Sequence, residues 1–434
     1  MNKNINNRFN SMKQEYWVYI VDNYQRDLPA LAWWIFNGDL HQGHKICLLP
    51  MGDINASFMI SKKPDVIVWN YARSNNINAI KVASLLNIYN IIHDTEGIPY
   101  HMDKYFSNIS NSDFQYIDEI WCWGNYQAQT ITNRISNLKK YPLIKITGSI
   151  RYEYAKSLPK GNLTSNMMEM LWCTNYAIIS PKYQSVWKEF NEYFNTYKLM
   201  QREKSLETFL EFSANRQSAL EYIISLLSSN DKIMIRIRPH PFESSESYDK
   251  KLINNYENVD YSRYSNVQDD LNNCCLILNS GCQTSLDAFI RGIPSLRLNK
   301  EEINIWSKVT PYINKEALSS KISTEFLNEL LLKQDSLFRN NNISLYLFNL
   351  ERAISIKSKN ISSKKVKRKP HLYHMKRTIN LFYIYIKVII KYKILKKSKD
   401  KKSLRLSSED IHEYLQEHYQ HKHWSYKINC ILFP

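Results

Sequence analysis

The residues best suited to bind phosphate lie in two short stretches. The first, IMIRIRPHPFE (233–243), alternates apolar residues with Arg236 and Arg238 and then reaches Pro239-His240-Pro241. This pattern predicts a buried strand that delivers Arg238 and His240 to its carboxyl end. A guanidinium and an imidazole at that position can both bind an anion. A lone His-Pro pair is weak support by itself.

The second stretch is CLILNSGCQTSLDAFIRGIP, residues 275–294. It predicts a strand, a turn, and a helix over about 283–291. In an open α/β sheet, ligands bind beyond the carboxyl ends of the strands, and a helix N-terminus there attracts anions. Plain helix capping by the hydroxyls is the alternative. The predicted phosphate ligands in this stretch are Ser280, Gly281, Thr284 and Ser285.

An alternating series of strands and helices precedes these stretches. A parallel, doubly wound sheet explains such alternation, and it predicts a first Rossmann-like domain over residues 14–158. The apolar strands expected in this domain are 16–22, 44–50, 65–70, 87–97, 117–124 and 143–148.

A second series predicts another Rossmann-like domain over 165–345. Its expected elements are strands at 170–180, before His240, before Ser280 and at 294–299, with helices at 182–229 and 247–255. Thr174 and Asn175 belong to its first strand region, from which side chains can reach a phosphate. The fold class is therefore α/β, with two Rossmann-like domains facing a cleft.

Composition separates the last part of the chain from the rest. The chain has 434 residues and a net charge of +17, and most of the excess lies after residue 355. We expect residues 356–434 to form a basic, helical, membrane-associating tail, in which Lys387, Lys391 and Lys393 alternate with aromatic and β-branched residues. A solvated basic face or packing against the main body is the alternative. Nucleic-acid binding is not expected, because no recognised signature accompanies the charge.

The cysteines and the apolar segments indicate the compartment. The seven cysteines lack paired C-x-x-C spacing, as expected in a reducing environment. No secretory signal and no uncharged apolar span of membrane length is visible. His41 and His44 have no third ligand at suitable spacing, so no metal site is expected. We therefore expect a cytoplasmic protein, peripheral on the inner face of the cell membrane.

These motifs together resemble bacterial surface-carbohydrate glycosyltransferases of the GT-B type, and more narrowly the capsule and lipopolysaccharide enzymes that use CMP-activated nonulosonic acids or Kdo. RPHP is similar to their His-Pro motif, which implies that His240 contacts the nucleotide phosphate. SGCQTSLDAFIRGIP is similar to the donor segment of GT-B enzymes, which implies that Asp287 contacts ribose. ITGSIRYEY resembles a Gly-x-x-Arg stretch, and Arg151 there is expected to bind a substrate carboxylate or to form a salt bridge.

HDTEG (93–97) resembles the acidic motif that supplies the catalytic base in CMP-sialic acid transferases. Thr95 stands where that family has its first acid, which leaves Glu96 as the first choice of base and Asp94 as the second. Inverting transfer needs such a carboxylate to take the proton of the acceptor hydroxyl. An Asx turn or a helix cap is the plainer explanation for each residue.

The resemblance implies metal-independent transfer of a sugar from a nucleotide donor, expected to be CMP-linked, to a glycan or lipid-linked acceptor, with no cofactor. A CDP-glycerol or CDP-ribitol phosphotransferase is one alternative. A non-catalytic scaffold of a polysaccharide assembly complex is the other. The donor sugar, acceptor, linkage, stereochemistry and oligomeric state stay open at this stage.

Overall fold

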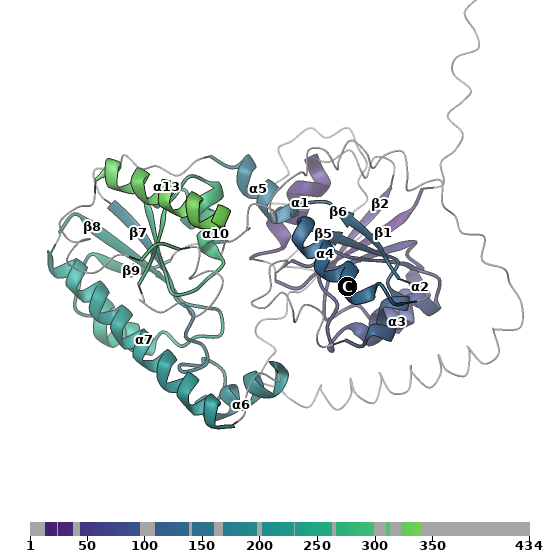
Figure 1. Cartoon of the computed structure of the whole chain (residues 1–434), viewed down its shortest axis with the longest axis horizontal. Helices are drawn as coiled ribbons and strands as arrows, with labels where there is room; N and C mark the ends of the chain where they lie inside the picture. Colours follow the sequence, from purple (N-terminus) through teal and green to yellow (C-terminus); the bar gives the residue numbers. More distant parts are fainter. Residues whose placement is uncertain are drawn as a thin grey trace, which may run out of the picture. The chain divides into compact units, whose positions relative to one another are not determined.

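The computed structural model describes eleven segments of the chain between residues 14 and 340. These segments are 14–23, 25–37, 44–95, 109–138, 141–159, 168–197, 202–229, 231–262, 266–298, 310–312 and 323–340. Glu96, His41 and the expected tail over 356–434 lie outside the described residues. The chain divides between Arg151 and Tyr152 into two compact units, and each unit holds one sheet (Figure 1).

The first sheet has six strands in the order β2-β1-β3-β4-β5-β6, and every pair of neighbours is parallel. The doubly wound parallel sheet expected from the sequence is therefore confirmed. Its strands are β1 (Tyr16–Val21), β2 (Lys45–Pro50), β3 (Val66–Trp69), β4 (Tyr89–Ile92), β5 (Glu119–Cys122) and β6 (Leu143–Ile146). The helical segments of this unit are α1 (Leu28–Asn37), α2 (Ala56–Lys62), α3 (Ile77–Leu85), η3 (Asn111–Tyr116) and α4 (Asn125–Ile135), and α5 (Ile150–Ser157) contains the point at which the two units divide.

Continuous apolar strands explain why helices cover this sheet. All six residues of β1 are buried, as is typical of a parallel strand with both faces covered. Val18 and Trp69 from the sheet share one core cluster with Met59 of α2, Ile80 of α3 and Ile131 of α4. These three helices therefore pack on one face of the first sheet.

The second sheet has five parallel strands in the order β11-β10-β7-β8-β9. They are β7 (Met168–Cys173), β8 (Ile233–Arg238), β9 (Val259–Tyr261), β10 (Leu276–Asn279) and β11 (Ser295–Arg297). The helical segments around them are α6 (Val186–Tyr197), α7 (Arg202–Ser229), α8 (Glu246–Tyr248), η4 (Asp249–Ile253), α9 (Val267–Asp270), α10 (Thr284–Ile290) and α13 (Thr324–Asn340).

The two faces of the second sheet alternate along each strand, as the period of a strand requires. Met170 and Trp172 of β7 belong to a cluster with residues of α7 and α13. Leu171 and Cys173 point to the other face, where they join Ala288 of α10. Both faces of β7 are thus buried, and this strand is the centre of the second unit.

Some elements differ from the sequence-based expectation. The strand expected over 170–180 ends at Cys173, because the next residues turn away to bond with the loop that follows β8. The strand expected over 87–97 covers only β4, and the helical region over 182–229 is two helices. Within the described part of the chain, none of the helices combines the length and apolarity that a membrane crossing requires.

Candidate functional site

The carboxyl ends of three strands meet at the centre of the second sheet. Strand β7 pairs with β8 on one side and with β10 on the other, so the order of the chain across the sheet reverses at β7. Cys173 is aligned with both Arg238 and Asn279, the last residues of those neighbours. The loops that follow β7, β8 and β10 therefore leave the same edge at a topological switch point, where open α/β sheets bind ligands.

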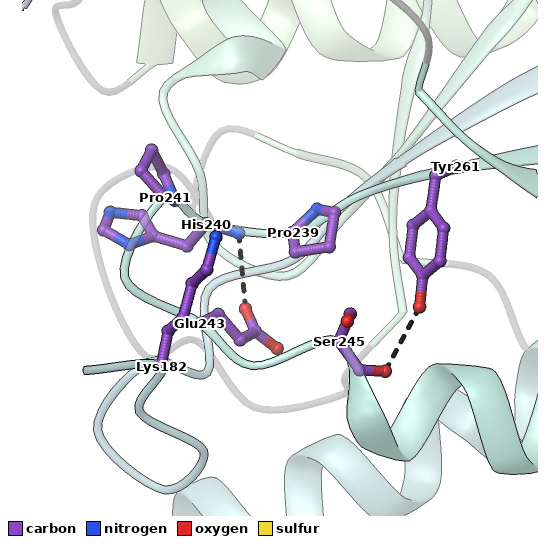
Figure 2. A pocket seen from close by; sticks show the side chains of 7 residues that line it. All are labelled: Lys182, Pro239, His240, Pro241, Glu243, Ser245 and Tyr261. Atoms are coloured by element: carbon purple, nitrogen blue, oxygen red, sulfur yellow. Dashed lines mark hydrogen bonds between the residues drawn. The ribbon is translucent and has the colours of Figure 1, made fainter. Parts of the chain in front are cut away.

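A cavity of about 300 Å³ lies beside this edge (Figure 2). The turn after β8 forms most of its wall. The residues that line it are Lys182, Pro239, His240, Pro241, Glu243, Ser245 and Tyr261. The cavity is therefore built largely from the RPHPFE stretch, with additions from the segment after β7 and from β9.

A buried carboxylate holds this turn in place. Glu243 Oε2 accepts hydrogen bonds from Thr174 Oγ1 at 2.7 Å, from the Tyr176 N–H at 3.0 Å and from the His240 N–H at 3.4 Å. Tyr248 Oη donates to the other carboxylate oxygen. Burial raises the pKa of the Glu243 carboxyl above its usual value, and the hydrogen bonds from its donors only partly offset this effect. Glu243 thus ties the end of β7 to the His-Pro turn.

The His240 ring has a defined tautomer. Its Nδ1 accepts a hydrogen bond from the Phe242 backbone N–H at 3.3 Å, and the two rings lie 5.7 Å apart. A nitrogen that accepts cannot carry the hydrogen of a neutral imidazole, so that hydrogen is on Nε2. His240 can therefore donate from Nε2 to an anionic oxygen without being protonated.

Lys182 brings a positive charge to the cavity. Its backbone N–H donates to the Phe242 carbonyl at 2.9 Å, and its ammonium group lies 5.3 Å from the centre of the Tyr183 ring. Tyr261 Oη lies 2.8 Å from Asp249 Oδ1 and 3.1 Å from the Ser245 carbonyl oxygen, and its one hydrogen can be donated to either. The lining of the cavity thus includes an imidazole and an ammonium group, together with the carboxyl of Glu243.

Arg238 is already paired within the protein. Its Nη1 donates to Asp270 Oδ2 at 2.5 Å and to Ser262 Oγ at 3.1 Å. Burial raises the pKa of the Asp270 carboxyl, and the nearby Arg238 guanidinium only partly offsets this effect. Because a buried carboxylate balances its charge, Arg238 adds less to phosphate binding than its position in the sequence suggests. A contact between Arg238 and a nucleotide stays a prediction.

The turn after β10 is arranged by its own side chains. The side chain of Asn279 makes two hydrogen bonds across the turn. Its amide nitrogen donates to the Cys282 carbonyl at 2.8 Å, and its oxygen accepts the Cys282 N–H at 2.5 Å. Ser280 is buried, and its hydroxyl accepts from Trp172 Nε1 at 3.2 Å. Gly281 has a φ of 87°, which a residue with a Cβ rarely adopts.

The other predicted ligands of this stretch lie in α10. Ser285 Oγ donates to the Cys282 carbonyl at 3.1 Å, and Thr284 Oγ1 lies 3.2 Å from Cys282 Sγ. Asp287 is fully buried in the first turn of the helix. The structure therefore uses these side chains inside the fold, and their contacts with phosphate or ribose stay predictions.

The two residues after β7, Thr174 and Asn175, were both predicted to reach a phosphate. Thr174 is buried and donates its hydroxyl to Glu243. Asn175 is half-buried. Of the two, Asn175 has the side chain better placed to meet a ligand at the switch point.

The remaining predicted residues belong to the first unit. Asp94 is the second residue after β4 and is buried, and its backbone carbonyl accepts from Trp123 Nε1 at 2.8 Å. Arg151 lies in α5, half-buried. Glu96, the first choice of base, lies outside the described residues. Among the described residues, no group of three or more histidine, cysteine or acidic side chains is placed to hold a metal ion.

Two residues of the site escaped the sequence analysis. Glu243 is the last residue of the RPHPFE stretch. A charged residue directly after the Pro-His-Pro-Phe turn could have indicated a side chain that hydrogen-bonds to that turn. Nothing in the sequence around Lys182 indicated a binding site. This residue is distant in sequence from the RPHPFE stretch, and an isolated antiparallel bridge between its neighbour Pro181 and Glu243 brings it to the cavity.

No protein-family model and no curated protein matches the chain. Similar solved structures include the UDP-GlcNAc 2-epimerase of Methanocaldococcus jannaschii, with 13% identity, a TM-score of 0.45, and coverage of 76% of this chain and 99% of that one. The UDP-GlcNAc 2-epimerase of Neisseria meningitidis bound to UDP-GlcNAc has 10% identity, a TM-score of 0.47 and coverage of 79% and 97%. The wall teichoic acid polymerase TagF has 12% identity, a TM-score of 0.43 and coverage of 75% and 84%.

Proposed function

We propose that the chain is a glycosyltransferase of bacterial surface-polysaccharide synthesis that binds a nucleotide-sugar donor at the carboxyl edge of the second sheet. The donor is proposed to be a CMP-linked ulosonic or nonulosonic acid, and the acceptor a glycan or a lipid-linked glycan. The choice of donor rests on the resemblance of RPHP and HDTEG to the motifs of CMP-sugar transferases. The site at the second sheet rests on geometry.

The observation that supports the proposal most is the state of His240. Its Nδ1 accepts the Phe242 N–H, so in the neutral ring Nε2 carries the hydrogen, and we propose that it donates this hydrogen to a phosphate oxygen. Glu243 fixes the backbone of the same turn. A donor held in place before the reaction stabilises charge that develops on a leaving group, because the protein need not rearrange.

Lys182 supplies the charge that the phosphate needs. It lines the same cavity as His240, and an ammonium group attracts a phosphate as a point charge. Asn175 and the turn after β10 are proposed to complete the donor site from the other side of β7. Nucleotide recognition would thus come from three loops at one switch point.

The proposed reaction needs a leaving group and a base. The acceptor hydroxyl oxygen forms a bond to the anomeric carbon, while the bond between that carbon and the phosphate oxygen breaks and its electron pair stays on the nucleotide. His240 and Lys182 stabilise the phosphate that leaves. The proton of the acceptor goes to a carboxylate, which we propose to be Glu96 or, second, Asp94. The chain is proposed to work on the inner face of the cell membrane.

A thermal-shift panel with CMP, CDP, UDP, GDP and ADP on the full chain tests the donor site. A nucleotide at 100 times its Kd stabilises a protein by about 2.7 kcal/mol, which raises the midpoint of unfolding by several degrees. We expect CMP to give the largest shift. His240→Ala removes a hydrogen bond to a charged group, so nucleotide binding should weaken at least about tenfold.

His44→Ala is the matched control for this variant. His44 Nδ1 also accepts a backbone N–H at 3.3 Å, and its ring also lies near an aromatic ring, but it belongs to the first unit. Nucleotide binding should therefore be unchanged in His44→Ala. A wild-type nucleotide shift in His240→Ala would refute the assignment of the site. A shift selective for CDP would favour the phosphotransferase, and no shift with any nucleotide would favour the scaffold.

A further inference from the structure

The cavity beside the second sheet has two chemically different ends (Figure 2). One end is lined by His240 and Lys182, which carry an imidazole and an ammonium group. Tyr261 and Ser245, which carry hydroxyl groups, lie apart from His240 in Figure 2 and line the other end. Tyr261 is the last residue of β9 and is aligned with Ile237 of β8, three residues before His240. The proposed phosphate contacts of the cavity involve only the first of these ends.

The hydroxyl group of Tyr261 uses its hydrogen inside the protein. Its oxygen lies 2.8 Å from Asp249 Oδ1 and 3.1 Å from the Ser245 carbonyl oxygen. A carboxylate and a carbonyl can only accept, so the hydrogen goes to one of these two oxygens. Burial raises the pKa of the Tyr261 hydroxyl, and the hydrogen bond to Asp249 raises it further, so the group keeps its hydrogen. Tyr261 Oη therefore offers a ligand its lone pairs and not a hydrogen.

The hydroxyl group of Ser245 is arranged in the same way. Ser245 Oγ donates to Asp249 Oδ2 at 3.4 Å, so the carboxylate of Asp249 accepts from both hydroxyl groups that line this end of the cavity. A hydroxyl that donates its one hydrogen still has lone pairs that can accept. Tyr261 and Ser245 thus place two neutral acceptor oxygens at the same end of the cavity.

Ser262, the next residue along the chain from Tyr261, shows how the fold uses a hydroxyl completely. Its oxygen accepts from Arg238 Nη1 at 3.1 Å, and its hydrogen is donated to Asp270 at 2.7 Å. Both functions of that hydroxyl are therefore taken up by the protein. The oxygen of Tyr261 instead lines a cavity, where a ligand can supply the donor.

We propose that this end of the cavity receives the amino group of a nucleobase, and that Tyr261 and Ser245 thereby select cytosine over uracil. The exocyclic amino group of cytosine carries two hydrogens, which match two acceptor oxygens. Uracil has a carbonyl oxygen at the same ring position, and this oxygen would meet lone pairs instead of hydrogens. That the amino group belongs to a nucleotide rests on the proposed function, whereas the accepting character of this end does not.

The selection follows from the cost of a wrong pairing. A site built to hydrogen-bond one polar group rejects an analogue that lacks it, because the polar atoms of the site are then left unpaired. For a buried acceptor, the loss corresponds to about tenfold or more in affinity. Because the discriminating group is an amino group, the same end also tolerates a base in which the rest of the ring differs but the amino group is retained.

Isothermal titration calorimetry of the full chain tests the selection. The probes are CMP, UMP and the 5′-monophosphate of pyrimidin-2-one riboside, which has only a hydrogen where cytosine has its amino group. We expect CMP to bind at least about tenfold more tightly than UMP, with the third nucleotide between them. Tyr261→Phe keeps the aromatic ring and removes the acceptor oxygen, and it should reduce the ratio of CMP to UMP affinity to less than about threefold.

Tyr183→Phe is the matched control. The Tyr183 ring lies near the cavity, 5.3 Å from the Lys182 ammonium group and 6.2 Å from the Phe242 ring, but Tyr183 is not one of the described residues that line it. The variant makes the same chemical change and should keep the wild-type ratio. If Tyr261→Phe does not fold, Ser245→Ala serves in its place, because it removes the second acceptor and leaves the bond between Tyr261 and Asp249.

Three results would overturn the proposal. They are equal binding of CMP and UMP by the wild-type chain, an unchanged ratio in Tyr261→Phe, and loss of the ratio in Tyr183→Phe. His240→Ala separates this proposal from the proposed function, since it should weaken CMP and UMP equally and leave their ratio unchanged. Equal binding of CMP and UMP that His240→Ala weakens would refute base selection and sustain the donor site. Binding of none of the three nucleotides would refute both.

Discussion

At the scale of single residues, the second unit depends on one buried carboxylate. Glu243 accepts hydrogen bonds from the ends of two strands and from α8, and it has a raised pKa because it is buried. Glu243 supports the His-Pro turn, but when its buried carboxyl is ionised it lowers the free energy of unfolding. The contribution of Glu243 to stability therefore depends on pH.

We predict that Glu243→Gln changes the pH dependence of stability. A folded-state pKa above the unfolded value means that the contribution of Glu243 is fully present below about pH 4 and is lost as the pH rises through the folded-state pKa. The amide keeps an acceptor for Thr174 and can donate to Tyr248, so the variant should fold. Its midpoint of unfolding, measured by calorimetry from acid to neutral pH, should rise relative to wild type as the pH increases.

Glu246→Gln removes an exposed carboxylate three residues away and is the control for this experiment. Its midpoint should follow the wild-type curve at every pH. If the difference between Glu243→Gln and wild type were constant across the same range, the carboxyl of Glu243 would not titrate differently in the folded and unfolded states.

At the scale of elements, the connection from β10 to α10 shows how a short turn fixes a site. Asn279 makes two hydrogen bonds to the backbone of Cys282, and Gly281 between them adopts a positive φ. The sequence predicted the strand, the turn and the helix correctly. It did not reveal that Ser280 and Ser285 bond inside the protein, because that depends on Trp172, a residue distant in sequence, and on the path of the turn.

Gly281→Ala should destabilise the protein. A Cβ in the left-handed region costs about 1 to 2 kcal/mol, so the free energy of unfolding in urea should fall by that amount. Gly52→Ala is the control, because Gly52 does not have a positive φ and a Cβ there meets no atom within 4 Å. Its stability should stay level or rise slightly. Equal stability of Gly281→Ala and wild type would show that the turn relaxes to accept a side chain.

At the scale of the whole molecule, sequence patterns predicted the sheets better than the site. Continuous apolar runs such as YWVYIV identified the parallel strands, because burial on both faces leaves a strong signal. The polar contacts were harder to predict from the sequence. Glu243 bonds to Thr174, and Arg26 bonds to Thr95, and in each pair the two residues are 69 positions apart. Such pairings depend on strand order, which periodicity does not contain.

The uneven charge of the chain gives a prediction for the full protein. The expected tail over 356–434 lies outside the described residues, so its role stays a proposal from sequence. Each Lys near an anionic membrane adds about 1 kcal/mol of binding. Replacing Lys387, Lys391 and Lys393 by Gln should weaken binding to phosphatidylserine vesicles at least about tenfold in a sedimentation assay.

Phosphatidylcholine vesicles are the control for this assay, and the full chain should bind them weakly. The difference between the two lipids should shrink as salt is added, because the attraction is electrostatic. Equal sedimentation of the wild-type chain with both lipids would remove the electrostatic basis of the proposed membrane association.

The order of strands also has a consequence for how the chain is made. The last strand of the first sheet ends at Ile146, so a ribosome has delivered every strand of that sheet before β7 begins at Met168. The two strands that pair with β7 are synthesised later, since β8 begins at Ile233 and β10 at Leu276. At roughly 5 to 20 residues per second, the apolar faces of β7 stay without a sheet for several seconds. A chaperone that binds nascent chains should therefore crosslink most strongly while β7 has emerged and β8 has not.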